Sequence, residues 1–127
     1  HEGSISTIPA NSPRDAMSRL ETLVLMAGMD SPLRAIREQI ASAIDVVIQL
    51  ERQEDGKRRL VSVQEINGME GEIITMQEIF AFRQTGVSAD GAVEGYFQAT
   101  GVRPKFSDRL RSFGIAMPGD PDYAGLI

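Results

Sequence analysis

The sequence contains no cysteine, no tryptophan and a single histidine. The lack of cysteine excludes disulfide bonds and thiolate zinc sites, and one histidine without cysteine disfavours a transition-metal centre. No apolar run approaches the roughly 20 residues that a membrane-spanning helix needs, and no signal peptide is recognised. We therefore expect a soluble, cytoplasmic segment with no metal-binding residues and no direct membrane span.

Positive charge is also scarce. The 127 residues contain 13 lysines and arginines against 18 aspartates and glutamates, which gives a net charge of -5. This balance lacks the basic surface that nucleic acid requires, so we expect no nucleic-acid partner. Only two of the 13 basic residues are lysine, and the 11 arginines favour planar pairing with carboxylates or phosphates. A hydrophobic fraction of 42% suffices for one core.

The first 45 residues read as a strand followed by two helices. Residues 4–8 alternate isoleucine with serine and threonine, which is typical of a short strand. Ser12 and Pro13 form a helix start, Asp15 approximates a capping box, and Gly28 supplies the stop. A second start follows at Ser31-Pro32. The apolar positions at helical spacing are Ala16, Met17, Leu20, Leu23, Val24 and Ala27 in the first helix and Leu33, Ile36, Ile40 and Ile44 in the second.

From residue 46 the pattern changes to strands. Residues 46–50 form a nearly continuous apolar run and predict a buried strand. A turn around Asp55-Gly56 leads to a partner strand over residues 58–66. The next turn is expected at Asn67-Gly68 and Glu70-Gly71. The remaining predicted elements are a strand over 72–82 with a break near Gln77, a hairpin closed by Asp90-Gly91 with a strand over 92–99, a helix over 104–113 ended by Gly114, and a tail over 117–127.

The sequence opens with His1-Glu-Gly-Ser-Ile-Ser-Thr-Ile-Pro-Ala-Asn11 and continues into Arg19-Leu-Glu21. These segments resemble the histidine box and following helix of the secretion-superfamily ATPases, closest to the CpaF/TadA type that powers tight-adherence pilus assembly. His1 matches the first histidine of the family's histidine box, and Ala10-Asn11 matches its end. Pro9 stands where the second histidine is usual, and proline has no side-chain donor or proton. The similarity continues through Ser12–Ala16, Arg19–Glu21, Ala35–Ile44, Asp55-Gly56, Gly68–Gly71, Thr75–Phe80 and Gly101–Pro104.

The resemblance implies an α/β fold. Residues 1–52 would be the C-terminal part of a RecA-like P-loop ATPase core, residues 53–116 an antiparallel hairpin extension with a terminal helix, and residues 117–127 a tail. It also implies a hexameric motor on the cytoplasmic side of an inner-membrane platform protein, with neighbouring subunits as partners. The motor would use ATP and Mg²⁺, and His1 would sense the γ-phosphate. Because the sequence has no Walker A or Walker B motif, we expect this segment to bind no cofactor tightly and to be inactive alone.

Two other functions stay open. The extension from Gln53 to Phe113 could be a non-catalytic interaction module that docks on a platform protein or a neighbouring subunit. The chain could also be an unrelated, stand-alone α+β domain. A start at His1, in the middle of a motif, suggests an excised piece, whose uncovered sheet edges would favour self-association or marginal stability.

Simpler roles are expected for most charged and polar residues. For the helix arginines, surface ion pairs with residues such as Asp15, Glu21 or Glu38 outweigh an arginine-finger role. Met17, Met26 and Met29 are expected in the core or an interface. The hydroxyl groups of Ser4, Ser6 and Thr7 are expected on the polar face of the first strand. The charged residues around Asp55 are expected at a solvated hairpin tip, and the strand glutamates are expected to have no catalytic role. The helix arginines are Arg14, Arg19, Arg34 and Arg37. The residues of the hairpin tip are Glu51, Glu54, Asp55, Lys57, Arg58 and Arg59. The strand glutamates are Glu65, Glu70, Glu72 and Glu78.

Overall fold

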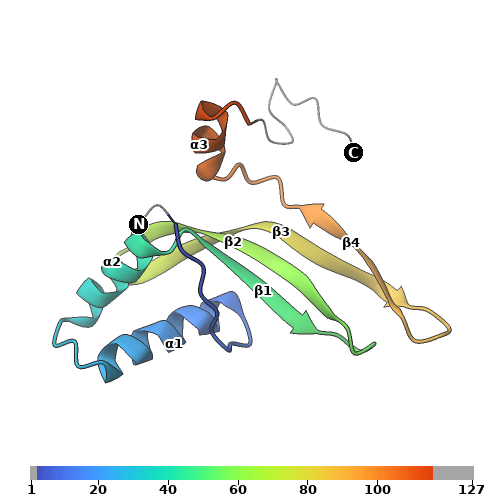
Figure 1. The fold of residues 1–127 in the computed structure, drawn as a ribbon, viewed down its shortest axis with the longest axis horizontal. Helices are drawn as coiled ribbons and strands as arrows, with labels where there is room; N and C mark the ends of the chain where they lie inside the picture. The colour runs from blue at the N-terminus through green and yellow to red at the C-terminus, as the bar shows by residue number, and fades with distance from the viewer. Residues whose placement is uncertain (1–2, 116–127) are drawn as a thin grey trace.

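Two helices, a four-stranded sheet and a third helix follow one another along residues 3–115, the part of the chain that the computed structural model describes. The sheet has the strand order β1-β2-β3-β4, and every neighbouring pair is antiparallel. Figure 1 shows α1 and α2 beside one end of the sheet and α3 after the end of β4. The elements are α1 (Pro13–Met26), α2 (Leu33–Ala43), β1 (Val46–Arg52), β2 (Arg58–Glu70), β3 (Ile73–Val87), β4 (Val93–Ala99) and α3 (Phe106–Ser112).

The expected α/β class is confirmed, but the strands expected from a RecA-like core are not found as predicted. The prediction of a strand over residues 4–8 was wrong, since these residues lie in no strand and Ile5 is 98% exposed. The prediction that residues 46–50 form a buried strand was also wrong in its burial. β1 is an edge strand, and Ile48 and Leu50 are 56% and 59% exposed. The described residues contain no parallel strand pair, so the RecA-like assignment depends on the resemblance alone.

Helix α1 begins as its sequence predicts. The Ser12 hydroxyl accepts the Asp15 N–H at 3.0 Å, and Pro13 occupies the first turn, where its missing N–H costs nothing. The Asp15 carboxylate accepts the N–H of Asn11 at 2.9 Å instead of that of Ser12, so the capping box is displaced by one residue. Gly28 has a φ of +88°, the left-handed conformation that ends the helix at the predicted position.

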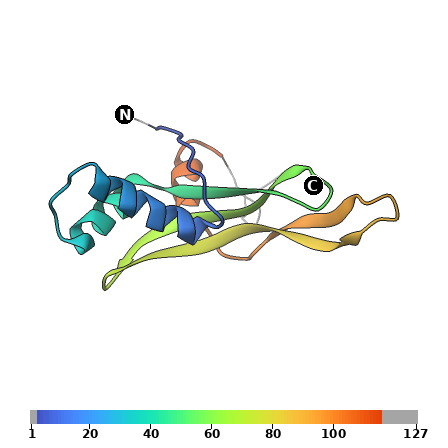
Figure 2. The ribbon, with the colours of Figure 1, turned by 90° about the horizontal axis from the view of Figure 1, so that it is seen from below.

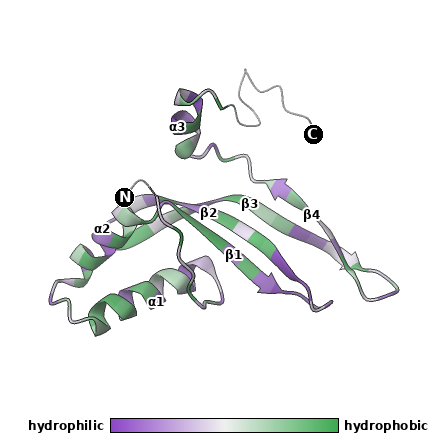
Figure 3. Ribbon diagram, viewed as in Figure 1, coloured by the Kyte–Doolittle hydropathy of each residue, from purple (hydrophilic) through white to green (hydrophobic). Residues whose placement is uncertain are grey.

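Helix α2 begins differently from α1. Pro32, rather than Ser31, is its N-cap, and no side chain caps it. Its stability therefore comes from packing: Ile36 and Ile40 are buried against α1 and the sheet, as the apolar spacing predicted. The buried core consists of Ala16, Met17, Ile36, Ile40, Ile66 and Ile74. In Figure 3 the helices and the neighbouring strand segments carry hydrophobic colours, and the hairpin end of β1 and β2 is hydrophilic.

The β2–β3 hairpin is longer than predicted. Its turn lies at Gly71, as expected from Glu70-Gly71, but the turn expected at Asn67-Gly68 is a β-bulge inside β2. The extra residue, Asn67, places Met69 on the same face as Ile66, so that both contact the core. β3 is not broken near Gln77; the register shifts two residues later, at the buried Ile79. Figure 2 shows this long twisted hairpin beside α1 and α2.

The C-terminal elements agree with their predictions. A turn at Ser88–Ala92 contains Asp90-Gly91 and joins β3 to β4. Helix α3 lies within the predicted range and ends before Gly114, which has a φ of +78°. The predicted tail lies outside the described residues. The boundary predicted between the core at residues 1–52 and the hairpin extension at residues 53–116 stays a prediction. The strands on its two sides, β1 and β2, belong to one sheet.

Candidate functional site

The predicted catalytic residue, His1, lies outside the described residues. The rest of the histidine-box segment is anchored to the sheet at its end. The Gln49 amide of β1 donates a hydrogen bond to the carbonyl oxygen of Ala10 at 3.1 Å, and the Gln49 residue is only 7% exposed. Pro9, just before this anchor, is exposed. The segment that carries the motif is therefore attached to β1 directly before α1 begins.

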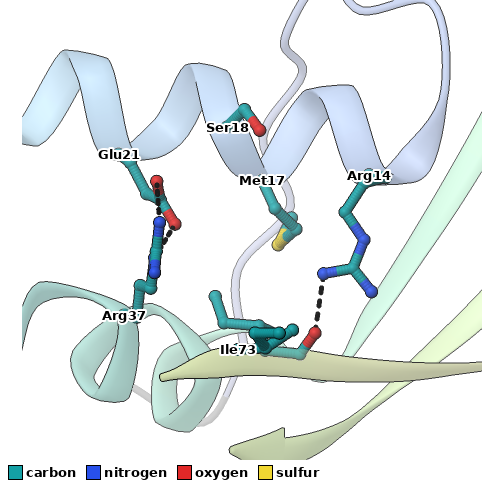
Figure 4. Close-up of a pocket in the computed structure, with 7 residues that line it drawn as sticks. Arg14, Met17, Ser18, Glu21, Arg37 and Ile73 are labelled. Carbon is teal, nitrogen blue, oxygen red and sulfur yellow. Dashed lines mark hydrogen bonds and ion pairs between the residues drawn. The ribbon is translucent and has the colours of Figure 1, made fainter. Parts of the chain in front are cut away.

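Arginines from α1 and α2 meet at a small pocket against the β2–β3 turn, shown in Figure 4. Its volume is about 130 Å³. The lining residues are Arg14, Met17, Ser18, Glu21, Arg37, Ile73 and Ile74. Two guanidinium groups and one carboxylate leave this pocket with a net positive charge on a chain whose overall net charge is -5.

Arg37 has a structural role in this pocket. Its guanidinium donates to both carboxylate oxygens of Glu21, at 2.7 and 3.5 Å, and to the carbonyl oxygen of Glu72 at 2.9 Å. The hydrogen bond to Glu21 raises the pKa of Arg37. A bidentate pair of this kind fixes two elements in orientation as well as distance. Arg37 therefore joins α2 to α1 and to the β2–β3 turn.

Arg14 differs from the other helix arginines. Arg19 pairs with Asp15 at 2.9 Å, and an i,i+4 pair joins Arg34 and Glu38 on the α2 surface at 3.1 Å. The Asn11 N–H, and after it Arg19, lowers the pKa of Asp15. Among residues 3–115 Arg14 has no carboxylate partner, and one of its nitrogens donates to the carbonyl oxygen of Ile74 at 2.6 Å.

The predicted surface ion pairs are thus confirmed for three arginines, whereas no such pair is found for Arg14 within the described part of the chain. Its guanidinium carries five N–H donors, and the bond to Ile74 uses one. Arg14 is therefore the pocket residue able to bind a carboxylate or phosphate from another molecule.

Two of the strand glutamates, Glu65 and Glu78, accept hydrogen bonds from other parts of the fold. Glu65 is only 4% exposed, and its carboxylate accepts the N–H groups of Lys105 and Phe106 at 2.7 and 3.0 Å, where α3 begins. Glu78 accepts the Ser62 hydroxyl at 2.8 Å. Within the described range, no three histidine or acidic side chains are grouped closely enough to hold a metal ion. No local signal predicted the capping role of Glu65, because its partners lie 40 and 41 residues away in the sequence.

The end of α1 and the turn into α2 expose a group of large apolar side chains. Met17 is buried in the core, which is one of the two places predicted for the methionines, whereas Met26 is 78% exposed. We call this group the α1–α2 corner. It consists of Leu23, Leu25, Met26, Met29 and Leu33.

Asp55 holds two hairpins together, and the expectation of a solvated tip was wrong for this residue. Its side chain is 6% exposed and accepts two hydrogen bonds from Arg59, at 2.9 and 2.7 Å. It also accepts the N–H of Val93, at the start of β4, at 3.1 Å. The Arg59 hydrogen bonds are the largest cause of a pKa for Asp55 well below its ordinary value.

Replacing Asp55 by asparagine is expected to destabilise the chain at pH 7. The folded state depresses this pKa, so the carboxylate's contribution is complete above its unfolded pKa of about 3.9 and is lost as the pH falls below that value. The urea midpoints of wild type and Asp55→Asn should therefore differ at pH 7 and converge towards pH 2. Glu51→Gln, which removes the same charge from an exposed residue of β1, is the control. A constant difference at both pH values would contradict the ion-pair explanation.

Two proteins of Mycobacterium tuberculosis, from strains CDC 1551 and H37Rv, are similar to this chain, and each bears the name "putative conjugal transfer protein". Each is 33% identical over 92 residues, a stretch that covers 72% of this chain and 25% of the relative. The chain thus spans about a quarter of the length of these curated relatives. No family model matches it. The helices of the described region are too short or too polar to cross a membrane.

Proposed function

We propose that this chain is the C-terminal part of a motor ATPase in a secretion or conjugation apparatus. The observation that carries the proposal is the 92-residue similarity to two proteins named for conjugal transfer. The ordered motifs that begin at His1 and end near Pro104 support the finer assignment to the CpaF/TadA type. In this proposal α1 and α2 belong to a RecA-like core, and the long hairpins extend from it.

The whole protein would assemble as a hexameric ring at the cytoplasmic side of an inner-membrane platform protein. ATP and Mg²⁺ would bind to a part of the protein outside these residues, since no Walker A or Walker B motif is present here. His1 would donate a hydrogen bond to the γ-phosphate or to a neighbouring acidic group. Arg14, whose charge has no carboxylate partner in the described region, would bind an acidic group of the adjacent subunit.

ATP hydrolysis by the full-length protein tests this function. We expect the 127-residue chain alone to show no turnover and the full-length protein to hydrolyse ATP. His1→Ala should lower kcat by about 100-fold, the usual cost of losing one positioned hydrogen bond to a charged transition state, and should leave the ring intact by light scattering. ATP hydrolysis that purifies together with the isolated 127-residue chain would contradict the proposed function. Full ATP hydrolysis by the His1→Ala protein would contradict the proposed role of His1.

The alternative is a non-catalytic interaction module formed by the extension from Gln53 to Phe113, and the exposure of Tyr96 (52%) and Phe97 (60%) on β4 is the observation that favours it. Arg14→Ala, with Arg34→Ala as the matched control, tests the proposed contact of Arg14 with the adjacent subunit, because Arg34 already has a carboxylate partner. A full-length protein that assembles and binds its platform protein but shows no hydrolysis would favour the interaction module. Loss of hydrolysis in His1→Ala with normal assembly would favour the motor.

A further inference from the structure

Two arginines lie directly opposite each other at the turn end of the β1–β2 hairpin, which is the end away from α2 in Figure 1. They are Arg52 and Arg58, and we call them the arginine pair. Gln53, the next residue, donates its N–H to the carbonyl oxygen of Lys57 at 2.9 Å, so the arginines form a non-hydrogen-bonded pair. The two side chains are closest in such a pair, with Cβ atoms about 4.5–5.5 Å apart. Like charges at this separation destabilise a hairpin, and an anion bound between them would remove that cost.

The acidic residues of this turn are bound elsewhere and do not neutralise the arginine pair. The Asp55 carboxylate accepts two hydrogen bonds from Arg59 and the N–H of Val93. The Glu54 carboxylate accepts the side-chain amide of Gln84 at 2.8 Å. Both arginines of the pair are exposed, and in the described part of the chain neither side chain forms a hydrogen bond or an ion pair. The hairpin therefore presents two free guanidinium groups side by side.

A pair of leucines lies next to the arginine pair on the same face of the sheet. Val47 packs against the helix core and Gln49 binds the segment before α1, so these two residues point towards the helices. Side chains alternate along a strand, which places Leu50 and Arg52 on the opposite face. Leu60 is the cross-strand partner of Leu50, and Leu50 is 59% exposed. The leucine pair and the arginine pair are thus two neighbouring rows, about 7 Å apart along the strands.

We propose that these two rows bind an amphipathic helix of another protein, in which an apolar residue and an acidic residue follow each other on one face. Each row is two side chains wide, which is about the 10 Å diameter of one helix. Residues four positions apart on a helix are separated by about 6 Å along its axis, close to the spacing of the rows. The helix carboxylate would accept hydrogen bonds from both guanidinium groups, and the apolar residue would cover Leu50. The inference goes beyond the proposed function, since this contact needs neither ATP nor a ring.

A single acidic group fits this site better than a surface of many negative charges. Glu51 and Glu54, both exposed, lie within two residues of Arg52, and the whole chain has a net charge of -5. Nucleic acid or an anionic membrane would bring further negative charge against these carboxylates. Phosphate groups would also leave the leucine pair without an apolar partner. A protein helix supplies one carboxylate and one apolar side chain at the required spacing.

Fluorescence anisotropy with the full-length protein and a labelled synthetic helix tests the proposal. The probe is an alanine-rich helix of about 14 residues, in which two leucines and one glutamate follow one another at four-residue spacing. The control probe has glutamine in place of the glutamate. We expect the glutamate probe to bind at least about tenfold more tightly than the glutamine probe, because only the carboxylate forms charge-assisted hydrogen bonds with both arginines. Equal affinities, or no binding of either probe, would overturn the proposal.

Two double variants show whether the arginine pair is responsible. Arg52→Gln with Arg58→Gln should lower the affinity of the glutamate probe to that of the glutamine probe. Arg34→Gln with Arg109→Gln removes the same charge from exposed residues of α2 and α3 and should leave the affinity unchanged. An equal loss in both double variants would mean that only the net charge matters, and would overturn the proposal. If the first double variant does not fold, the comparison of the two probes on the wild type still decides.

Three other results would assign a different partner to the arginine pair and overturn the proposal. The first is binding of phosphatidylglycerol vesicles, without probe binding, that the double variant loses. The second is self-association in light scattering, without probe binding, that the double variant loses. The third is a lower urea midpoint for Arg52→Gln at low salt, which would mean that Arg52 has a carboxylate partner within the full-length protein. Removing one of two unpaired like charges should instead leave the midpoint unchanged or raise it.

Discussion

Ile36→Ala is expected to lower the free energy of unfolding by about 2–5 kcal/mol, the range for removing a large aliphatic side chain from a packed core. Ile36 is 1% exposed and lies in the cluster between α1, α2 and the sheet. Because α2 has no side-chain cap at its N-terminus, packing of this face is the main force that holds the helix in place. Urea denaturation followed by circular dichroism measures the change.

Leu33→Ala on the same helix is the matched control. Leu33 is 42% exposed, so its truncation removes little buried surface and should cost less than about 1 kcal/mol. Equal losses for the two variants would mean that α2 does not pack on the sheet through Ile36. Equal losses would also contradict the fold described for α1 and α2.

Glu65→Ala is expected to release α3 and to lower the free energy of unfolding by about 3 kcal/mol, the scale of losing two hydrogen bonds to a buried charged group. The carboxylate of Glu65 accepts the N–H groups of Lys105 and Phe106, which are otherwise left without an acceptor at the start of the helix. Hydrogen exchange should report the release first, as faster exchange of the amides in the last turn of α3.

Glu65→Gln and Glu70→Ala separate the reasons for this effect. Glutamine keeps one acceptor oxygen but loses the charge, so Glu65→Gln should fall between wild type and Glu65→Ala. Glu70 is an exposed residue at the end of the same strand, and its truncation should change stability by less than about 0.5 kcal/mol. If α3 exchanges at the wild-type rate in Glu65→Ala, the carboxylate is not what positions the helix.

Local signals in the sequence predicted the local structure well. The cap at Ser12, the stop at Gly28, and the turns at Asp55-Gly56 and Asp90-Gly91 are all found where they were expected. Each of these features depends on the preferences of residues within four or five positions of one another, which is why the sequence alone suffices. The apolar spacing of the helices was sufficient for the same reason.

Predictions that depended on long-range partners were less successful. The apolar run of β1 predicted burial on both faces, but burial depends on which elements cover a strand, and those elements are far away in sequence. Asn67-Gly68 has turn composition and is a bulge, because the register with β3 must bring Met69 to the core. For the candidate site, the sequence predicted ion pairs for the arginines of the two helices, and three of them are found. It did not predict that Arg14 would face the turn of a distant hairpin.

By itself, the sequence determined an α/β chain with two amphipathic helices, antiparallel hairpins, an acidic balance and no cysteine chemistry. These properties follow from composition, periodicity and short-range capping, and they hold wherever the elements are placed. Only the tertiary structure decided that Glu65 caps α3, that Asp55 joins two hairpins and that, among residues 3–115, Arg14 has no carboxylate partner and β1 has a free edge. These features depend on contacts between residues up to 60 positions apart, and no local preference encodes the choice of such a partner.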